Sequence, residues 1–262
     1  MRDPDSPHRS TAELAATSGE ILERVRARRP RVHCITNAVA QNFTANLLLA
    51  AGARPSMTIS PEEIGAFVAR ADALLVNLGT FDKERREAAD TAIEVAAEEG
   101  LPWVLDPVLI DRSPARAAYA RTLVVRAPRA LRLNGAEFTA LAEVEPEAEA
   151  LRRYALDALT VIGLTGEVDL VTDGARLAAL GNGHALMSRV TAMGCVASAL
   201  VAACLAVESD PWLATVAALL ALGVAGEVAA ASARGPGSFA ADILDALYRL
   251  DRQTLARRAE VR

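Results

Sequence analysis

Short apolar runs alternate with longer amphipathic stretches along most of this chain. Each run is bounded by polar or turn residues, the pattern of a strand that is buried on both faces of a sheet. The predicted strands are residues 32–36, 56–59, 73–76, 103–105, 130–133 and 159–164. Helical patterns at 82–99, 115–125 and 147–158 supply crossovers between strands. The alternation predicts an α/β fold with a mainly parallel central sheet flanked by helices on both faces.

Further elements are predicted outside this alternating region. The additional helices are Thr11–Arg28, Gln41–Ala51, 61–69 after a Ser60 cap, and 212–233 as a buried core helix. Residues 168–172 and 176–180 are separated by a short Gly-containing turn, which predicts a hairpin at the sheet edge. We expect one domain over residues 1–262, with residues 1–10 disordered.

Composition favours a small-molecule partner. Aromatic residues make up only 4% of the chain, and its net charge is −5 with scattered basic residues, so we expect no nucleic-acid partner. No apolar stretch of membrane-spanning length lacks breaks, and no signal pattern opens the chain, so we expect no membrane partner and no secretion. Cys34, Cys195 and Cys204 form no close pair, which disfavours a disulfide framework or zinc cluster and favours a cytoplasmic location.

Polar residues follow several of the predicted strands. Ligands of open α/β sheets bind at the carboxyl ends of the strands, where Asp106, Glu137 and Thr165 are expected. Two carboxylates and a hydroxyl at one rim suit a magnesium-bound triphosphate. Each motif alone has a plainer interpretation, because Asp106-Pro107 is typical of a turn and residues 134–137 are typical of a helix cap.

A Gly-Cys pair at Gly194 and Cys195 precedes an alanine-rich helix predicted over residues 196–207. A helix N-terminus presents unpaired N–H groups to an anion, and its dipole is expected to lower the pKa of a thiol placed there. Cys195 is therefore a candidate for a polar or proton-handling role beside a phosphoryl group. The alternative is an ordinary buried cysteine at the start of a core helix.

Many motifs occur in one order over about residues 27–250. They are residues 32–39, 42–46, 48–53, Met57, 76–80, 105–108, 164–169, 182–184 and 235–239. Taken together they resemble the hydroxyethylthiazole kinase family of the ribokinase-like superfamily. That resemblance implies a cytoplasmic enzyme of thiamine salvage that phosphorylates the alcohol of 4-methyl-5-(2-hydroxyethyl)thiazole with ATP and Mg²⁺.

The resemblance also implies roles for individual residues. It implies that the thiazole lies between the subunits of a homotrimer, bound by Asn37, Val39, Met57 and Gly194. It assigns ATP phosphates to Arg132 and Thr165, with Asn134 beside them as a nucleotide-binding residue. It assigns magnesium to Asp106 and Glu137 and a catalytic place to Gly194 and Cys195.

The departures from the family pattern cluster on the nucleotide side. Ala192 replaces a glycine, Met193 and Leu133 replace small residues, and residues 109–112 replace a run of small residues. If the backbone at Ala192 needs a positive φ, its Cβ costs roughly 1 kcal/mol and narrows the phosphate site. Two alternatives to the thiazole kinase therefore stay open: a trimeric thiazole-binding paralogue with weak or no kinase activity, and a kinase for another small heterocyclic alcohol.

Overall fold

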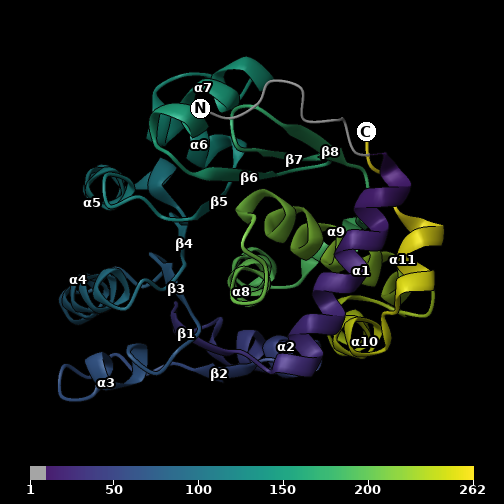
Figure 1. Ribbon diagram of the computed structural model, residues 1–262, viewed down its shortest axis with the longest axis horizontal. Helices are drawn as coiled ribbons and strands as arrows, with labels where there is room; N and C mark the ends of the chain where they lie inside the picture. Colours follow the sequence, from purple (N-terminus) through teal and green to yellow (C-terminus); the bar gives the residue numbers. More distant parts are fainter. Residues whose placement is uncertain (1–9) are drawn as a thin grey trace.

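The computed structural model describes residues 10–262 and shows a three-layer α/β architecture (Figure 1). The predicted disorder of residues 1–10 falls outside this part except for Ser10, which caps the first helix. The strands are β1 Arg31–Ile35, β2 Arg54–Ser56, β3 Ala73–Asn77, β4 Trp103–Asp106, β5 Ala130–Asn134, β6 Val161–Thr165, β7 Asp169–Thr172 and β8 Leu177–Leu180. They form one sheet in the order β2-β1-β3-β4-β5-β6-β7-β8.

The sheet is parallel from β2 to β6 and antiparallel where β7 and β8 join it. The predicted hairpin is therefore confirmed, and it lies at the sheet edge as expected. Because β1 to β6 run in one direction, their carboxyl ends meet at one rim of the sheet.

Helices cover both faces of the sheet (Figure 1). One face carries α3 Ile64–Val68, α4 Lys83–Glu98, α5 Pro114–Val124, α6 Gly135–Ala142 and α7 Ala148–Asp157. The other carries α1 Thr11–Arg28, α2 Gln41–Ala51, α8 Met193–Leu205, α9 Pro211–Ala230, α10 Pro236–Arg249 and α11 Arg252–Arg258. Two 3₁₀ turns, Ile110–Arg112 and Ala185–Arg189, complete the elements.

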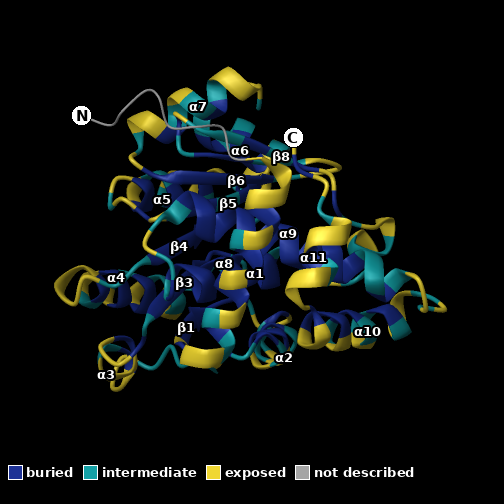
Figure 2. Ribbon diagram, turned by 45° about the vertical axis from the view of Figure 1, so that its right-hand side comes forward, coloured by how far each residue is buried: buried dark blue, intermediate teal, exposed yellow. Residues whose placement is uncertain are grey.

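Alternate strand residues enter two separate hydrophobic cores. Leu75 of β3 packs into the core with α8 and α9, whereas Leu74 and Val76 pack into the core with α4 and α5. Successive side chains of a strand point to opposite faces of the sheet, and here both faces are covered by helices. Each strand therefore needs apolar residues at nearly every position, which explains the continuous hydrophobic runs in the sequence. Figure 2 shows α8, α9 and the central strands as the most buried part of the molecule.

Helix α9 is the long apolar helix of this core. It is apolar enough and long enough to cross a membrane, but 83% of its most apolar 18-residue window is buried inside the fold. The prediction of a buried core helix is confirmed. All three cysteines are free and buried.

Two boundaries around Ser60 were predicted incorrectly. The strand expected at 56–59 is β2 Arg54–Ser56. After Ser56 the His33 ring takes the place of the ladder, because its Nε2–H donates to the Thr58 carbonyl at 3.0 Å and its Nδ1 bonds Ser56 Oγ at 2.8 Å. The helix expected at 61–69 begins only at Ile64, since residues 61–63 form a turn whose Glu63 N–H bonds the Ser60 carbonyl.

Candidate active site

The carboxyl ends of β3 to β6 and the start of α8 form one site. Parallel register places Asn77 beside Asp106 on β3 and β4, and Asn134 beside Thr165 on β5 and β6. Helix α8 contacts β1, β3, β4 and β5, so its first turn faces the same rim. The sequence prediction that distant segments converge here agrees with this arrangement.

Asn77 links the two chemically active groups of the site. Its Nδ2 donates to Asp106 Oδ2 at 2.7 Å and to Cys195 Sγ at 3.3 Å. Its Oδ1 accepts from the Gly79 N–H at 3.0 Å. With both donors and the acceptor in use, the amide has a single orientation, and it fixes the sulfur relative to the carboxylate.

Asn37 and Ser198 complete this network. Asn37 Nδ2 donates to Cys195 Sγ at 3.1 Å, and Ser198, one turn into α8, donates its hydroxyl to Asp106 Oδ2 at 2.8 Å. A side chain at Gly79 would place its Cβ only 2.4 Å from the Asn37 Cβ, so glycine is required for this close approach. The network joins a predicted substrate residue, a predicted catalytic residue and a predicted metal residue.

The Cys195 thiol is not activated by its position at the helix start. Burial, together with the Asp106 carboxylate, raises its pKa to about 12, and the hydrogen bonds from Asn37 and Asn77 oppose this shift. The prediction of a lowered pKa is therefore wrong, because desolvation and a neighbouring negative charge outweigh the helix dipole. At neutral pH Cys195 is a thiol, and it accepts two N–H hydrogen bonds.

Asp106 and Glu137 form a buried carboxylate pair. Burial raises the pKa of both groups, and the Asp106 carboxylate raises that of Glu137 further. The two oxygens of Glu137 accept the N–H groups of Leu109 and Asn134, each at 2.9 Å. Glu137 thus closes a capping box with Asn134 at the start of α6, which was the plainer interpretation of this motif.

The donor set is compatible with a hard cation but is small. Asp106 Oδ1 is buried and has no hydrogen-bond partner among the described residues, as expected of an oxygen reserved for a ligand. Glu137 retains lone pairs beyond those used by its two N–H partners. Within residues 10–262 no group of three or more His, Cys, Asp or Glu side chains is arranged to hold a metal ion, so any cation there would need further oxygen ligands.

Arg132 places a positive charge at the same rim. Its guanidinium donates to Thr165 Oγ1 and lies against Gly194, where an added Cβ would come within 2.4 Å of Nη1. Its Nε is buried and has no partner in the described part of the chain. The charge also lowers the pKa of Asp106 against the larger effect of burial. Arg132, Thr165 and Gly194 thus form one cationic and donor-rich surface.

This surface opens into the large cavity of about 930 Å³ beside α8 and α9. Arg132, Asn134, Thr165, Met193 and Gly194 line one part of it. The rest is lined by residues 181–185, Met187 and Ser188, and by Ala197, Leu219, Leu222 and Gly223 of α8 and α9, together with Gly166, Glu167 and Asp169. A lining that combines polar and charged groups with apolar side chains of α8 and α9 suits a phosphorylated ligand with an organic part.

The residues that depart from the family pattern differ in whether they reach the cavity and in their backbone conformation. Ala192 adopts φ +70°, the left-handed conformation that makes its Cβ costly, and Met193 lines the cavity as expected. Leu133 is fully buried in the core with α6 and does not reach the cavity. Leu109 also has a positive φ of 60°, and its N–H is one of the two that bond Glu137.

The other two predicted substrate residues lie at the edge of this arrangement. Val39, two residues after Asn37, is 76% exposed, and Met57 is partly buried against the core that contains α2 and α8. Neither lines the large cavity.

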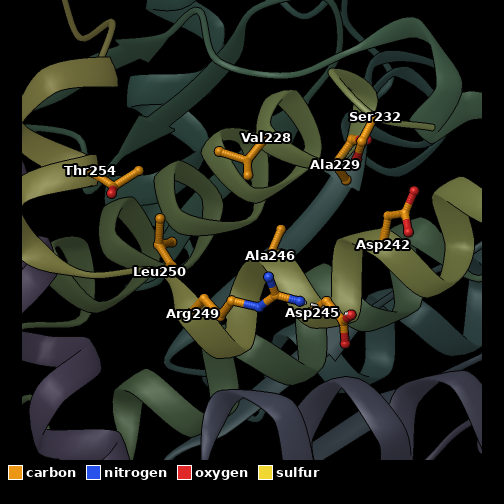
Figure 3. A pocket seen from close by; sticks show the side chains of 9 residues that line it. All are labelled: Val228, Ala229, Ser232, Asp242, Asp245, Ala246, Arg249, Leu250 and Thr254. Atoms are coloured by element: carbon orange, nitrogen blue, oxygen red, sulfur yellow. Dashed lines mark hydrogen bonds and ion pairs between the residues drawn. The ribbon is translucent and has the colours of Figure 1, made fainter.

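A second cavity, of about 220 Å³, lies between α9, α10 and the start of α11 (Figure 3). Its charged side chains are Asp242, Asp245 and Arg249, and the last two form an ion pair at 3.1 Å. None of the predicted site residues lines it.

Sequence reasoning did not assign Asn77 and Ser198 to the site. The sequence indicates Asn77 only as part of the motif at residues 76–80, although Asn77 and Asp106 each follow a predicted strand directly, which was a signal for contact. Ser198 follows Gly194 by four residues, so it lies on the same face of α8. Helical spacing from the Gly-Cys pair could therefore have identified it.

Comparison with known proteins identifies the family. The family model described as Hydroxyethylthiazole kinase family matches residues 22–253. The chain belongs to the hydroxyethylthiazole kinase family. A probable hydroxyethylthiazole kinase from Agrobacterium fabrum is 43% identical over 247 residues, which cover 94% of this chain and 95% of that protein. The hydroxyethylthiazole kinase of Clavibacter sepedonicus is also 43% identical, over 88% of this chain and 89% of its own length.

Solved structures agree with this assignment. The structure of a hydroxyethylthiazole kinase protein from Pyrococcus horikoshii OT3 matches with a TM-score of 0.90 and 41% identity, covering 94% of this chain and 98% of that one. A ribokinase-like superfamily protein from Enterococcus faecalis shares the fold alone, with a TM-score of 0.69 and 11% identity over 89% of this chain and 95% of that one. The predicted family and the ribokinase-like α/β fold are both confirmed.

Proposed function

We propose that this protein transfers the γ-phosphoryl group of ATP to the hydroxyl of 4-methyl-5-(2-hydroxyethyl)thiazole, the salvage reaction of thiamine synthesis. The observation that carries the proposal is the joining of Cys195, Asp106 and Asn37 by hydrogen bonds through Asn77, next to Arg132 and Gly194 at the large cavity. The family membership supports the same reaction.

The nucleotide fits the large cavity with its phosphates at the Arg132 end. Arg132, Thr165 and Asn134 supply side-chain donors there, and Gly194 in the first turn of α8 supplies a free N–H and the positive end of the helix dipole. These groups are fixed before the ligand arrives, so they stabilise charge on the phosphates without reorganising.

Asp106 and Glu137 are the residues that would hold Mg²⁺. The unpartnered Asp106 Oδ1 supports this assignment, and the cation would neutralise phosphate charge during transfer. In our proposal Asn77 and Ser198 orient Asp106 by donating to Oδ2, which leaves Oδ1 available.

The alcohol lies beside Cys195 in this proposal. The thiol keeps its proton at neutral pH, so we assign it to positioning the hydroxyl rather than to removing its proton. The hydroxyl oxygen then forms a bond to the γ-phosphorus while the bond from that phosphorus to the bridging oxygen breaks. The hydroxyl proton passes to an oxygen of the transferred phosphoryl group, and ADP leaves.

We further propose a homotrimer in the cytoplasm. Val39 is an exposed apolar side chain two residues after Asn37, and Leu49 of α2, the helix that follows, is 57% exposed. A partner subunit over these residues would bury them and close the thiazole pocket together with Met57. Three buried free cysteines are compatible with a reducing compartment.

A second candidate function is a thiazole-binding protein with impaired phosphoryl transfer. The left-handed Ala192 and the Met193 side chain at the cavity favour it, because both reduce the space for phosphates. The substrate side of the site would be unaffected in such a protein. The third possibility, a kinase for another heterocyclic alcohol, has no specific observation in its favour.

Release of ADP in a coupled assay, with and without hydroxyethylthiazole, tests the proposal. We expect turnover that depends on the alcohol, on ATP and on Mg²⁺, and that falls at least about 100-fold in Arg132→Ala, the loss typical of one charge-stabilising donor. Arg112→Ala is the matched control, since Arg112 is an exposed arginine near the same strand ends. Micromolar thiazole binding by calorimetry without turnover above background would establish the binder instead.

A further inference from the structure

One wall of the large cavity is formed by the loop that follows β8. Gly181, Asn182, Gly183 and His184 line the cavity there. The loop leaves the edge of the sheet, so the strand ladder alone does not determine its position. Its position depends on what packs behind it.

The Asn182 side chain binds the structure behind the loop. Its Nδ2 donates to Glu227 Oε1 at 2.8 Å and to the Arg258 carbonyl at 2.7 Å, and its Oδ1 accepts the Glu260 N–H at 2.8 Å. The residue is 7% exposed. Both N–H groups and the carbonyl are used within the protein, so the side chain fastens the loop and has no donor left for a ligand.

Residues after α11 form the other part of this support. Ala179 and Arg262 exchange backbone hydrogen bonds at 2.8 and 2.9 Å, and the Gly181 N–H bonds the Glu260 carbonyl at 2.8 Å. Val261 between them is buried at 7% exposure within the core. Residues 260–262 therefore pair with the outer side of β8 through an antiparallel bridge between Leu180 and Val261.

Helix α9 holds the loop from the second side. Glu227 Oε1 accepts the Gly183 N–H at 3.2 Å as well as the Asn182 amide. A side chain at Gly223 would place its Cβ 2.5 Å from the Asn182 carbonyl oxygen, so loop and helix are in backbone contact. The loop is thus clamped between α9 and residues 258–262, and moving either support moves the cavity wall.

We infer that Asn182 is a positioning residue for the nucleotide, and that residues 258–262 act with it as a clamp on the cavity wall at residues 181–184. The inference rests on the proposed function only in taking the cavity's ligand to be ATP. Among the residues that the structure describes, none of the hydrogen bonds that Asn182 and its supports make reaches the network around Cys195, beside which the alcohol is placed in the proposed function. Loss of the clamp therefore weakens nucleotide binding and leaves thiazole binding unchanged.

Asn182→Asp is the sharpest test. The variant keeps the size of the side chain and the acceptor for Glu260, but it turns a carboxylate oxygen toward the Glu227 carboxylate and the Arg258 carbonyl. We expect the dissociation constant of a nonhydrolysable ATP analogue, measured by calorimetry, to rise about tenfold, the effect of losing a buried hydrogen-bonded group. Thiazole affinity should stay within about twofold, and amide exchange at residues 181–184 should accelerate.

Arg257→Ala is the matched control. It removes an exposed guanidinium of α11 that lies outside the clamp and whose side chain bonds Thr254 Oγ1, so nucleotide affinity should not change. Asn182→Ala serves as the second variant if the aspartate proves poorly folded by circular dichroism.

The outcomes separate this inference from the proposed function. Unchanged nucleotide affinity in a folded Asn182 variant, or equal losses of nucleotide and thiazole affinity, would overturn the clamp and leave the proposed reaction intact. A wild-type protein that binds the ATP analogue, loses that affinity in Asn182→Asp and phosphorylates no alcohol would overturn the reaction and retain the clamp.

Discussion

Asn77 donates a 2.7 Å hydrogen bond to Asp106 from the neighbouring parallel strand, and the same amide nitrogen donates to the sulfur of Cys195. Strand register alone sets the first contact, and the placement of α8 across the strand ends sets the second. Asn77, to which the sequence analysis gave no role, therefore links the Asp106 carboxylate and the Cys195 thiol, both of which were predicted site residues.

Removing this amide should slow catalysis more than it weakens binding. We expect Asn77→Ala to lower kcat about 100-fold with KM for ATP changed less than threefold, because a misplaced catalytic group costs about that much. The lost donor also raises the pKa of Asp106, so the acid limb of the pH–rate profile should move to higher pH. Ser198→Ala removes the other side-chain donor to the same oxygen, which lowers the pKa of Asp106 at least as much as Asn77 does, and should shift the limb in the same direction by at least as much. A rise in KM alone would contradict this role.

The buried thiol should behave as a neutral group. Since burial raises the pKa of Cys195 to about 12, we expect no thiol ionisation in the pH–rate profile between pH 6 and 9. Cys195→Ser should retain kcat within about tenfold, because a hydroxyl accepts the same two amide donors. Steady-state rates across this pH range measure both effects. An inflection between pH 7 and 9 that disappears in the serine variant would show that a thiolate takes part.

Replacing Ala192 with glycine should raise the stability of the protein and lower its KM for ATP. Its φ of +70° strains an alanine by about 1 kcal/mol, part of which the greater backbone freedom of glycine in the unfolded state cancels. We expect Ala192→Gly to raise the melting temperature by about 1–2 °C and to lower KM for ATP about two- to threefold as the phosphate site widens.

The control for this change lies elsewhere in the chain. Ala127 has φ +53° in the turn after α5, and it is not among the residues that line the large cavity. Ala127→Gly should give a similar gain in melting temperature with no change in KM. Equal effects of both glycines on KM would mean that stability, and not the shape of the phosphate site, is responsible.

Asp169 should make the free energy of unfolding depend on pH. Burial raises its pKa from 3.8 to about 6, so the residue contributes stability when protonated and that contribution is lost as pH rises through 6. Asp169→Asn, which still accepts the Gly166 N–H, should therefore be more stable than wild type, by an amount that grows about 1 kcal/mol between pH 5 and pH 7. Denaturant titrations without nucleotide, carried out at pH 5 and at pH 7, measure the difference in free energy of unfolding between the variant and the wild type. Asp157→Asn, at the exposed end of α7, serves as the control substitution.

The sheet and most helices were predictable because their signals are local. Buried parallel strands need apolar residues on both faces, and Thr11–Arg28, Gln41–Ala51 and the hairpin carry their periodicity within a few residues. Of α6 only the cap at residues 134–137 was predicted, and α11 was not predicted, since helices of 8 and 7 residues contain too few turns to show a period.

The site was predictable as a set of strand ends but not as chemistry. The rim position of Asp106 follows from the sheet rule, whereas the pKa of Cys195 depends on burial and on a carboxylate 89 positions earlier in the chain, which no local pattern contains. Likewise, the support of the cavity wall by residues 258–262 joins segments nearly 80 positions apart, the separation between Asn182 and Glu260.

Both edges of the sheet are closed to further strands. On one side β2 is three residues long and contains Pro55, which has no N–H to offer a neighbour. On the other side residues 260–262 occupy the edge of β8. Detachment of this short segment would expose a row of unpaired backbone groups, so the residues that support the cavity wall also protect the protein from edge-to-edge aggregation.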